Sequence, residues 1–149
     1  MIRRIDHSKL GNANNIWDIF QHSYTVEAKI LKVDNFPPLN RSISQIMKSN
    51  NIFFAFYNCS DLVALIEIDS SKKNTHIQSL VVCPKYFRRG IGSKMVQFVL
   101  DTYNSNIFTV ETGADNYPAI NLYKHFAFKE EFNWDTEHGV RKIRLHRVS

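Results

Sequence analysis

The segment that most constrains the fold lies in the middle of the chain, at residues 81–94. An apolar run ends at a proline, a basic loop with Arg88 and Arg89 follows, and Gly90 and Gly92 open a helical pattern. The first N–H groups of a helix have no partner inside the helix and carry partial positive charge, so a helix start suits phosphate. Arginine adds charge-assisted hydrogen bonds, and glycine lets the backbone approach a ligand closely. The segment therefore predicts a strand–loop–helix unit that binds a diphosphate-bearing cofactor.

Other phosphate motifs do not fit this segment. A P-loop needs G-x-x-x-x-G-K-[ST], which does not occur, and a dinucleotide fingerprint needs a third glycine where Met95 stands. The alternative is a strand–turn–helix junction whose glycines and arginines serve packing and solubility. The motif alone leaves both interpretations open.

Composition indicates one globular domain over residues 1–149, with 44% hydrophobic and 13% aromatic residues. The apolar runs are too short for a membrane span, and the N-terminus lacks the apolar core of a signal peptide. Two cysteines make no disulfide framework, and six histidines lack metal-ligand spacing. We therefore expect a cytoplasmic protein without a metal, and no membrane partner.

The net charge of +5 suits an anionic cofactor, an acidic partner or nucleic acid. Basic residues gather near the C-terminus, where Lys142, Arg144 and His146 would share one face of an extended strand. We expect a solvated edge strand, because charged edges block aggregation between sheets. A nucleic-acid surface is the rival interpretation, and we do not favour it.

Hydrophobic periodicity predicts an alternation of strands and helices. Strands are expected at residues 2–7, 52–57, 62–68, 75–83, 107–112, 128–134 and 140–147, with a polar turn at 70–74. Helices are expected at about 16–30 with a break near Ser23, at 43–47, after Gly92, and from Pro118. This order predicts an α/β (α+β) fold with a mixed, mostly antiparallel, twisted sheet of about seven strands, helices on both faces and a crossover at 84–112.

Two segments resemble the GNAT superfamily of N-acetyltransferases. Residues 87–92 are similar to its acetyl-CoA pyrophosphate loop, Q/R-x-x-G-x-G/A, and residues 116–128 to its second cofactor segment, N-x-x-A-x-x-L-Y-x-x-x-G-F. Phe87 departs from the usual Gln or Arg, and Ala127 from the usual glycine, which favours a left-handed helix end. The resemblance extends to the element order and implies acetyl-CoA as acyl donor.

The resemblance also implies roles for individual residues. The backbone of Val81 and Val82 would pair with the pantetheine arm, and the Val82 N–H would polarise the thioester carbonyl. Asn116 would bond the cofactor arm, or serve only as a helix cap. Tyr123 would contact the cofactor and protonate the leaving thiolate as general acid, or serve only as a core aromatic. The diphosphate would be held by Arg88, Arg89, Gly90, Ile91, Gly92 and Ser93.

The general base stays open among Glu67, His76 and Glu111, which lie on strands near the expected site. A base is needed because most of a primary amine is protonated at neutral pH, and only the neutral form can attack the thioester. Cys83 is expected to be an apolar thiol rather than a nucleophile. In folds of this family the acceptor wall comes from the first helices and the last hairpin. The candidate acceptor contacts here are Tyr24, Asp34, Phe36 and Trp134.

The sequence thus predicts an acetyl-CoA-dependent N-acetyltransferase that transfers the acetyl group directly to an amine of a small molecule or peptide. A non-catalytic acyl-CoA-binding or sensing module is the alternative, since it would keep residues 88–93 without needing Tyr123. The acceptor amine is left open, and so is a homodimer.

Overall fold

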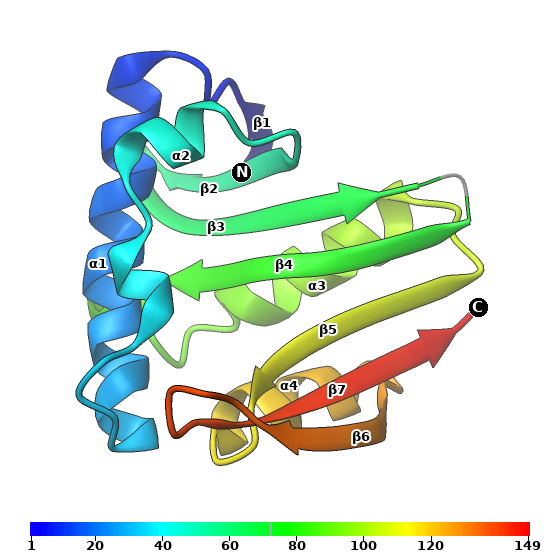
Figure 1. Cartoon of the computed structure of the whole chain (residues 1–149). Coiled ribbons are helices and arrows are strands. Elements are labelled where there is room, and N and C mark those ends of the chain that lie inside the picture. Colours follow the sequence, from blue (N-terminus) through cyan, green and yellow to red (C-terminus); the bar gives the residue numbers. More distant parts are fainter. Residues whose placement is uncertain (72) are drawn as a thin grey trace.

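Seven strands form a single sheet in the order β1-β2-β3-β4-β5-β7-β6 in the computed structural model, which describes residues 1–71 and 73–149 (Figure 1). The strands are β1 (Ile2–Ile5), β2 (Ile52–Asn58), β3 (Asp61–Ser70), β4 (Asn74–Val82), β5 (Ile107–Gly113), β6 (Lys129–Asp135) and β7 (Arg141–Val148). All neighbours are antiparallel except β4 and β5, which are parallel. The expected mixed, mostly antiparallel sheet is confirmed.

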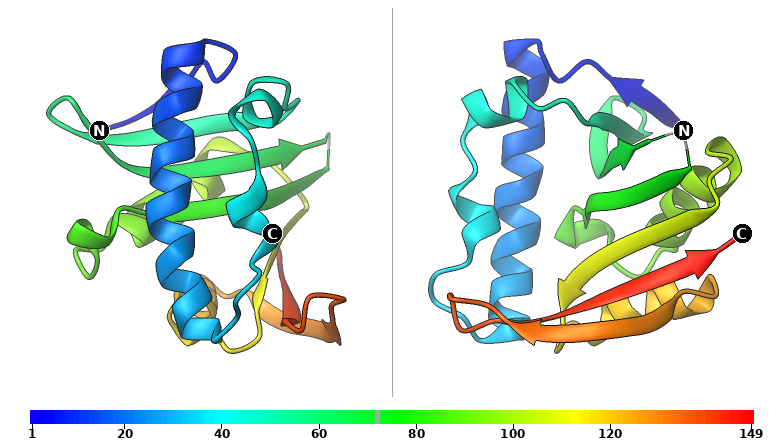
Figure 2. Two further views of the ribbon diagram at one scale, coloured as in Figure 1. Left: turned by 60° about the vertical axis from the view of Figure 1, so that its left-hand side comes forward. Right: turned by 45° about the vertical axis from the view of Figure 1, so that its right-hand side comes forward.

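Helices cover both faces of the sheet, as expected (Figure 2). The helical segments are α1 (Leu10–Leu31), η1 (Pro37–Asn40), α2 (Ile43–Met47), η2 (Pro84–Tyr86), α3 (Ile91–Thr102) and α4 (Tyr117–His125). On one face, Ile16 and Phe20 of α1 pack with Leu65 of β3 in a buried cluster. On the opposite face, Ile66 of β3 packs in a second cluster with α3 and α4. Adjacent β3 residues enter different clusters because side chains alternate across a strand.

The two parallel strands separate before they end, and this opens the sheet. Pairing between β4 and β5 runs from Asn74 opposite Ile107 to Ile77 opposite Val110. The register of β4 against β3 shifts at Gln78, which leaves this residue as a β-bulge. Beyond the bulge, β4 continues to pair with β3, while β5 continues to pair with β7. A wedge-shaped gap therefore opens between the ends of β4 and β5 (Figure 1).

Three local expectations need correction. The first long helix has no break at Ser23, because α1 runs unbroken from Leu10–Leu31. The basic strand β7 is not an edge strand: it lies between β5 and β6, and β6 forms the edge. The first strand ends at Ile5 rather than at residue 7. In the expected turn at 70–74, Lys72 lies outside the described residues.

Candidate active site

The gap between β4 and β5 opens into a cavity of about 1030 Å³. Its walls come from segments that are far apart in the sequence. Tyr24 and Glu27 reach it from α1, Arg41 from the segment after η1, and Lys142 from β7. Further walls come from β4 and β5, from the turn that leads into α3, from α4 and from the loop between β6 and β7. Such a concave site, apolar with a few converging polar groups, is typical of a ligand pocket.

The backbone of β4 offers free hydrogen-bonding groups to this gap. The Cys83 N–H donates to the carbonyl of Val63 in β3 at 2.8 Å, so Cys83 and Val63 are a hydrogen-bonded pair. Antiparallel pairing alternates, so the backbone of Val81 also faces β3, while Leu80 and Val82 face the gap. The Val81 side chain is buried in the cluster under α1. Of the two expected backbone contacts, the geometry brings Val82 to the cavity and leaves Val81 turned toward β3.

The turn before α3 has the geometry of an anion-binding loop. Arg88 and Gly90 both have left-handed backbone conformations, with φ of 64° and 75°. Alternation of left- and right-handed residues makes a concave row of N–H groups, a nest that binds anions. A Cβ added to Gly92 would lie 3.3 Å from the Leu122 side chain, so glycine lets α3 start close against α4. A left-handed arginine carries strain, which is typical of functional loops.

The expected diphosphate residues divide into two groups. Arg88, Gly90, Ile91 and Gly92 line the cavity. Arg89 and Ser93 are not among the described residues that line the cavity. The Arg89 guanidinium instead lies 5.2 Å from the centre of the Tyr86 ring. Phe87, in place of the family's Gln or Arg, lines the cavity and is 43% exposed.

Tyr123 combines the two interpretations that the sequence left open. It is only 4% exposed and its ring packs edge-on against Phe128, with centroids 5.4 Å apart, as a core aromatic would. It also lines the cavity. Burial, followed by the nearby Glu27 and Tyr24, raises the pKa of its hydroxyl above the ordinary value of 10.0. The hydroxyl therefore holds its proton at neutral pH.

Asn116 is the N-cap of α4, as one of its two interpretations predicted. Its side-chain oxygen accepts from the Ala119 N–H at 3.3 Å. Its amide nitrogen donates to Glu27 Oε1 at 2.5 Å and to Thr112 Oγ1 at 3.3 Å. Both polar atoms of this buried amide thus have partners within the protein. The expected contact to the cofactor arm stays a prediction.

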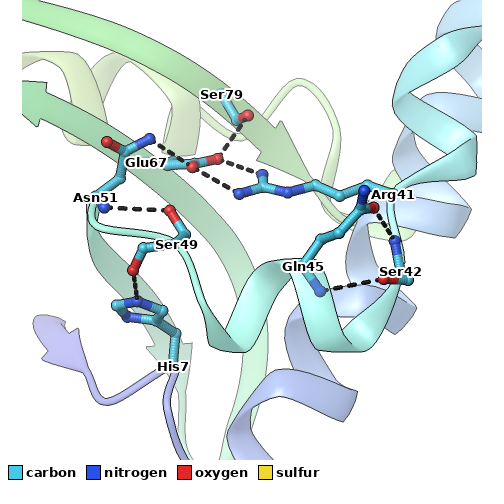
Figure 3. A network of polar contacts seen from close by, with 8 residues as sticks. All are labelled: His7, Arg41, Ser42, Gln45, Ser49, Asn51, Glu67 and Ser79. Carbon is cyan, nitrogen blue, oxygen red and sulfur yellow. Dashed lines mark hydrogen bonds and ion pairs between the residues drawn. The ribbon is translucent and has the colours of Figure 1, made fainter.

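Glu67 of β3 lies at the centre of a polar network that joins the segment after η1, the segment before β2, and β4 (Figure 3). It is fully buried, and Arg41 donates to both of its carboxylate oxygens, at 2.7 and 2.9 Å. Asn51 and Ser79 donate at 2.8 and 3.0 Å. Burial raises the pKa of Glu67, but the hydrogen bonds from Arg41 and Asn51 outweigh it and hold the pKa below its ordinary value. A carboxylate bound in this way is a weak proton acceptor.

The other two candidate bases are also engaged elsewhere. Glu111 lines the cavity, but Arg144 donates to its carboxylate at 2.7 Å. His76 does not reach this cavity: it lies in a separate hollow on the sheet face, with Nδ1 2.7 Å from Thr109 Oγ1. Burial lowers the pKa of His76. Of the three expected bases, Glu67 and Glu111 thus line the cavity as partners of an arginine, and His76 lies outside it.

Half of the expected acceptor contacts reach the cavity. Tyr24 and Phe36 line it, with their rings edge to face and centroids 5.9 Å apart. Asp34 and Trp134 are not among the described residues that line it, and the Trp134 ring packs beside Phe132 on β6.

Sequence reasoning missed Glu27, Arg41 and Lys142, which also line the cavity. Glu27 had a usable signal, because it follows Tyr24 by three residues and so shares its helix face. Among the described residues, no cluster of histidine, cysteine or carboxylate side chains fits a metal ion, and no helix is long and apolar enough to cross a membrane.

Two parallel strands that separate before they end, with the turn of Arg88 and Gly90 beside the gap, are the features that this fold contributes to the site. The chain belongs to the acetyltransferase (GNAT) family, whose model matches residues 13–128. Solved structures with the same fold include the ribosomal-protein-S18-alanine N-acetyltransferase from Escherichia coli (TM-score 0.78, 17% identity, 99% of this chain and 92% of that one). Another is the PaiA N-acetyltransferase from Thermoplasma acidophilum in complex with coenzyme A (TM-score 0.77, 12% identity, 100% and 98%).

Sequence relatives are longer than this chain. The UPF0157 protein YqkA of Bacillus subtilis is 30% identical over 132 residues, which are 87% of this chain and 38% of the relative. An N-alpha-acetyltransferase of Sulfolobus acidocaldarius is 39% identical over 70 residues, which are 44% of this chain and 42% of the relative. The chain thus spans less than half the length of these curated relatives.

Proposed function

We propose that this protein is an acetyl-CoA-dependent N-acetyltransferase that transfers the acetyl group directly to the amine of a small molecule or peptide. One observation carries the proposal. A single cavity collects the outward-facing backbone of Val82, the anion-binding turn at Arg88 and Gly90, and the protonated hydroxyl of Tyr123. These are the parts needed to hold a diphosphate, polarise a carbonyl and protonate a leaving group.

The residues around the gap between β4 and β5 fit acetyl-CoA as the acyl donor. Leu80 and Val82 would hydrogen-bond the amide-bearing arm as an added strand would, since β5 no longer occupies that edge. The nest at residues 88–90 and the start of α3 would hold the diphosphate. When bound there, acetyl-CoA supplies a thioester whose carbonyl carbon accepts the amine. The Val82 N–H would stabilise the negative charge that develops on the carbonyl oxygen.

The nucleic-acid alternative loses its support from β7. Arg141 pairs with Asp135 at 3.0 Å, and Arg144 pairs with Glu111 at 2.7 Å and with Glu131 at 3.3 Å. Two of the cations that suggested a phosphate-binding strand, Arg141 and Arg144, are therefore paired with carboxylates of the protein.

The first experiment is calorimetric titration with acetyl-CoA, followed by an assay of thiol release with a panel of amines. Arg88→Glu should weaken acetyl-CoA binding about tenfold or more, because a hydrogen bond between charged groups contributes about 1.5–3 kcal/mol. Arg89→Glu is the matched control, since this side chain lies on Tyr86 and should matter less. Absence of binding by the unmodified protein would overturn the proposal. Binding without acetyl transfer to any amine would favour the acyl-CoA-binding module.

A further inference from the structure

The proposed reaction needs a group that takes a proton from the ammonium form of the acceptor. Such a group must line the cavity, keep a free acceptor atom and have no guanidinium as its partner. Glu67 and Glu111 line the cavity but are each bound by an arginine, and His76 lies outside it. The proton must then go to another group of the cavity wall.

Glu27 is the remaining carboxylate among the described residues that line the cavity. It projects from α1, on the wall that faces Tyr123 and the N-terminus of α4. Asn116 donates to Oε1 at 2.5 Å, while Oε2 accepts no hydrogen bond from residues 1–71 and 73–149. No guanidinium is paired with it in this part of the chain. Glu27 therefore combines a fixed position with a free acceptor atom.

We propose that Glu27 is the general base of this site and that Asn116 is its positioning residue. The proposal rests on the acetyltransferase function proposed above. Asn116 would then have two roles: its amide nitrogen holds Glu27, and its side-chain oxygen caps α4.

The surroundings of Glu27 suit this role. Burial raises its pKa, while the hydrogen bond from Asn116 and the charge of Lys142 act in the opposite direction. Tyr24 and Tyr123 also face it, and Glu27 raises the pKa of both hydroxyls. The carboxylate thus helps to keep the acid protonated, while its own proton affinity moves toward the pH at which a base works best.

A close backbone contact fixes the end of α1 from which Glu27 projects. A Cβ added to Gly113, the last residue of β5, would lie 2.6 Å from a methyl carbon of Leu31. Glycine therefore lets the last turn of α1 lie directly against β5, one helical turn beyond Glu27. The base is held from two sides, by this contact and by Asn116.

The proton balance is complete with the groups present. The ammonium gives one proton to Glu27, and the freed nitrogen lone pair forms the N–C bond. The C–S bond breaks, and the thiolate takes a proton from Tyr123. The acylated nitrogen then gives its excess proton to the tyrosinate, and Glu27 releases its proton to water.

The test compares Glu27→Gln with Glu111→Gln, with Glu130→Gln on the exposed edge as control. Glutamine keeps an oxygen for Asn116 but cannot accept the proton. We expect Glu27→Gln to bind acetyl-CoA as the unmodified protein does and to lose about 100-fold or more in kcat. The acidic limb of the pH profile of kcat/KM should disappear with it. A larger loss in Glu111→Gln, or an unchanged profile in Glu27→Gln, would overturn the assignment.

A second measurement does not depend on turnover. Carboxyl carbon NMR of the folded protein should show Glu27, assigned by its absence in Glu27→Gln, titrating above its ordinary value of 4.5. Titration below that value would overturn the base role even if the enzyme is active. Loss of acetyl-CoA binding by the unmodified protein would instead overturn the proposed function, so the two failures are distinguishable.

Discussion

Removing the Arg41 guanidinium should leave Glu67 as an unpaired buried charge. Arg41 makes two hydrogen bonds to this carboxylate, at 2.7 and 2.9 Å, and Glu67 has no exposed surface. Breaking a buried ion pair by removing one partner costs about 3–5 kcal/mol, since the remaining charge stays desolvated. We therefore expect Arg41→Met to lose about 3–5 kcal/mol of unfolding free energy at pH 7.

A second substitution separates this charge effect from lost packing. In Arg41→Met/Glu67→Gln the buried charge is gone, while the glutamine can still accept from Asn51 and Ser79. The double variant should be more stable than Arg41→Met alone, a non-additivity expected for residues in contact. A double variant no more stable than the single one would refute the argument.

The pH dependence of the unfolding free energy tests the same charge effect independently. In the unmodified protein the pKa of Glu67 is held below its ordinary value, so its contribution is present above the unfolded pKa and is lost as pH falls through the folded pKa. In Arg41→Met only the hydrogen bonds from Asn51 and Ser79 still oppose burial, so we expect burial to raise the folded pKa above the unfolded one. The stability difference between the two proteins should then shrink on acidification from pH 7 to pH 4. Urea unfolding followed by tryptophan fluorescence measures it, and an equal difference at both pH values would contradict the charge argument.

Two further predictions concern single positions. Ala127 stands where the family has glycine and has a left-handed backbone, with φ of 65°. Because glycine adopts this conformation without strain, Ala127→Gly should raise the unfolding free energy by about 1 kcal/mol in the same urea assay. A loss of stability would refute this. Tyr123→Phe should lower kcat about 100-fold or more with little change in acetyl-CoA affinity, because only the acidic hydroxyl is removed. Assays of thiol release measure kcat, and calorimetry measures the affinity. Unchanged turnover would exclude the general-acid role.

The sequence predicts the strands and the anion-binding turn because their signals are local. Alternation, a proline at the strand end and two glycines within a few residues each indicate a backbone conformation directly. The position of β7 had no such signal. Its face with Lys142, Arg144 and His146 is half-buried, and an interior strand with one polar face has the same alternating pattern as an edge strand.

The partners of the site residues were not predictable for a different reason. Glu27 and Asn116 are 89 residues apart, and Arg41 and Glu67 are 26 apart, so neither contact follows from local pattern. Glu67 in particular looks like a candidate base on a strand near the site. Only its fourfold coordination by donors from three other segments shows that it has a structural task.

The gap between β4 and β5 raises a mechanical question, because sheet hydrogen bonds cannot hold the two halves together beyond Ile77 and Val110. The structure meets this need with contacts made by α1 and the segment that follows it. Leu31 packs against Gly113, and Glu27 accepts from Asn116, so the end of α1 is tied to β5 and α4.

A small apolar cluster completes this link. Ala28 of α1, Phe36 before η1 and Val140 before β7 are buried together, which connects the helix to the last hairpin. The same helix packs on β3 and β4 through its other buried residues. Because α1 packs on β3 and β4 and also contacts β5 and α4, it joins the two halves of the sheet across the gap. The same helix carries Tyr24 and Glu27 into the cavity.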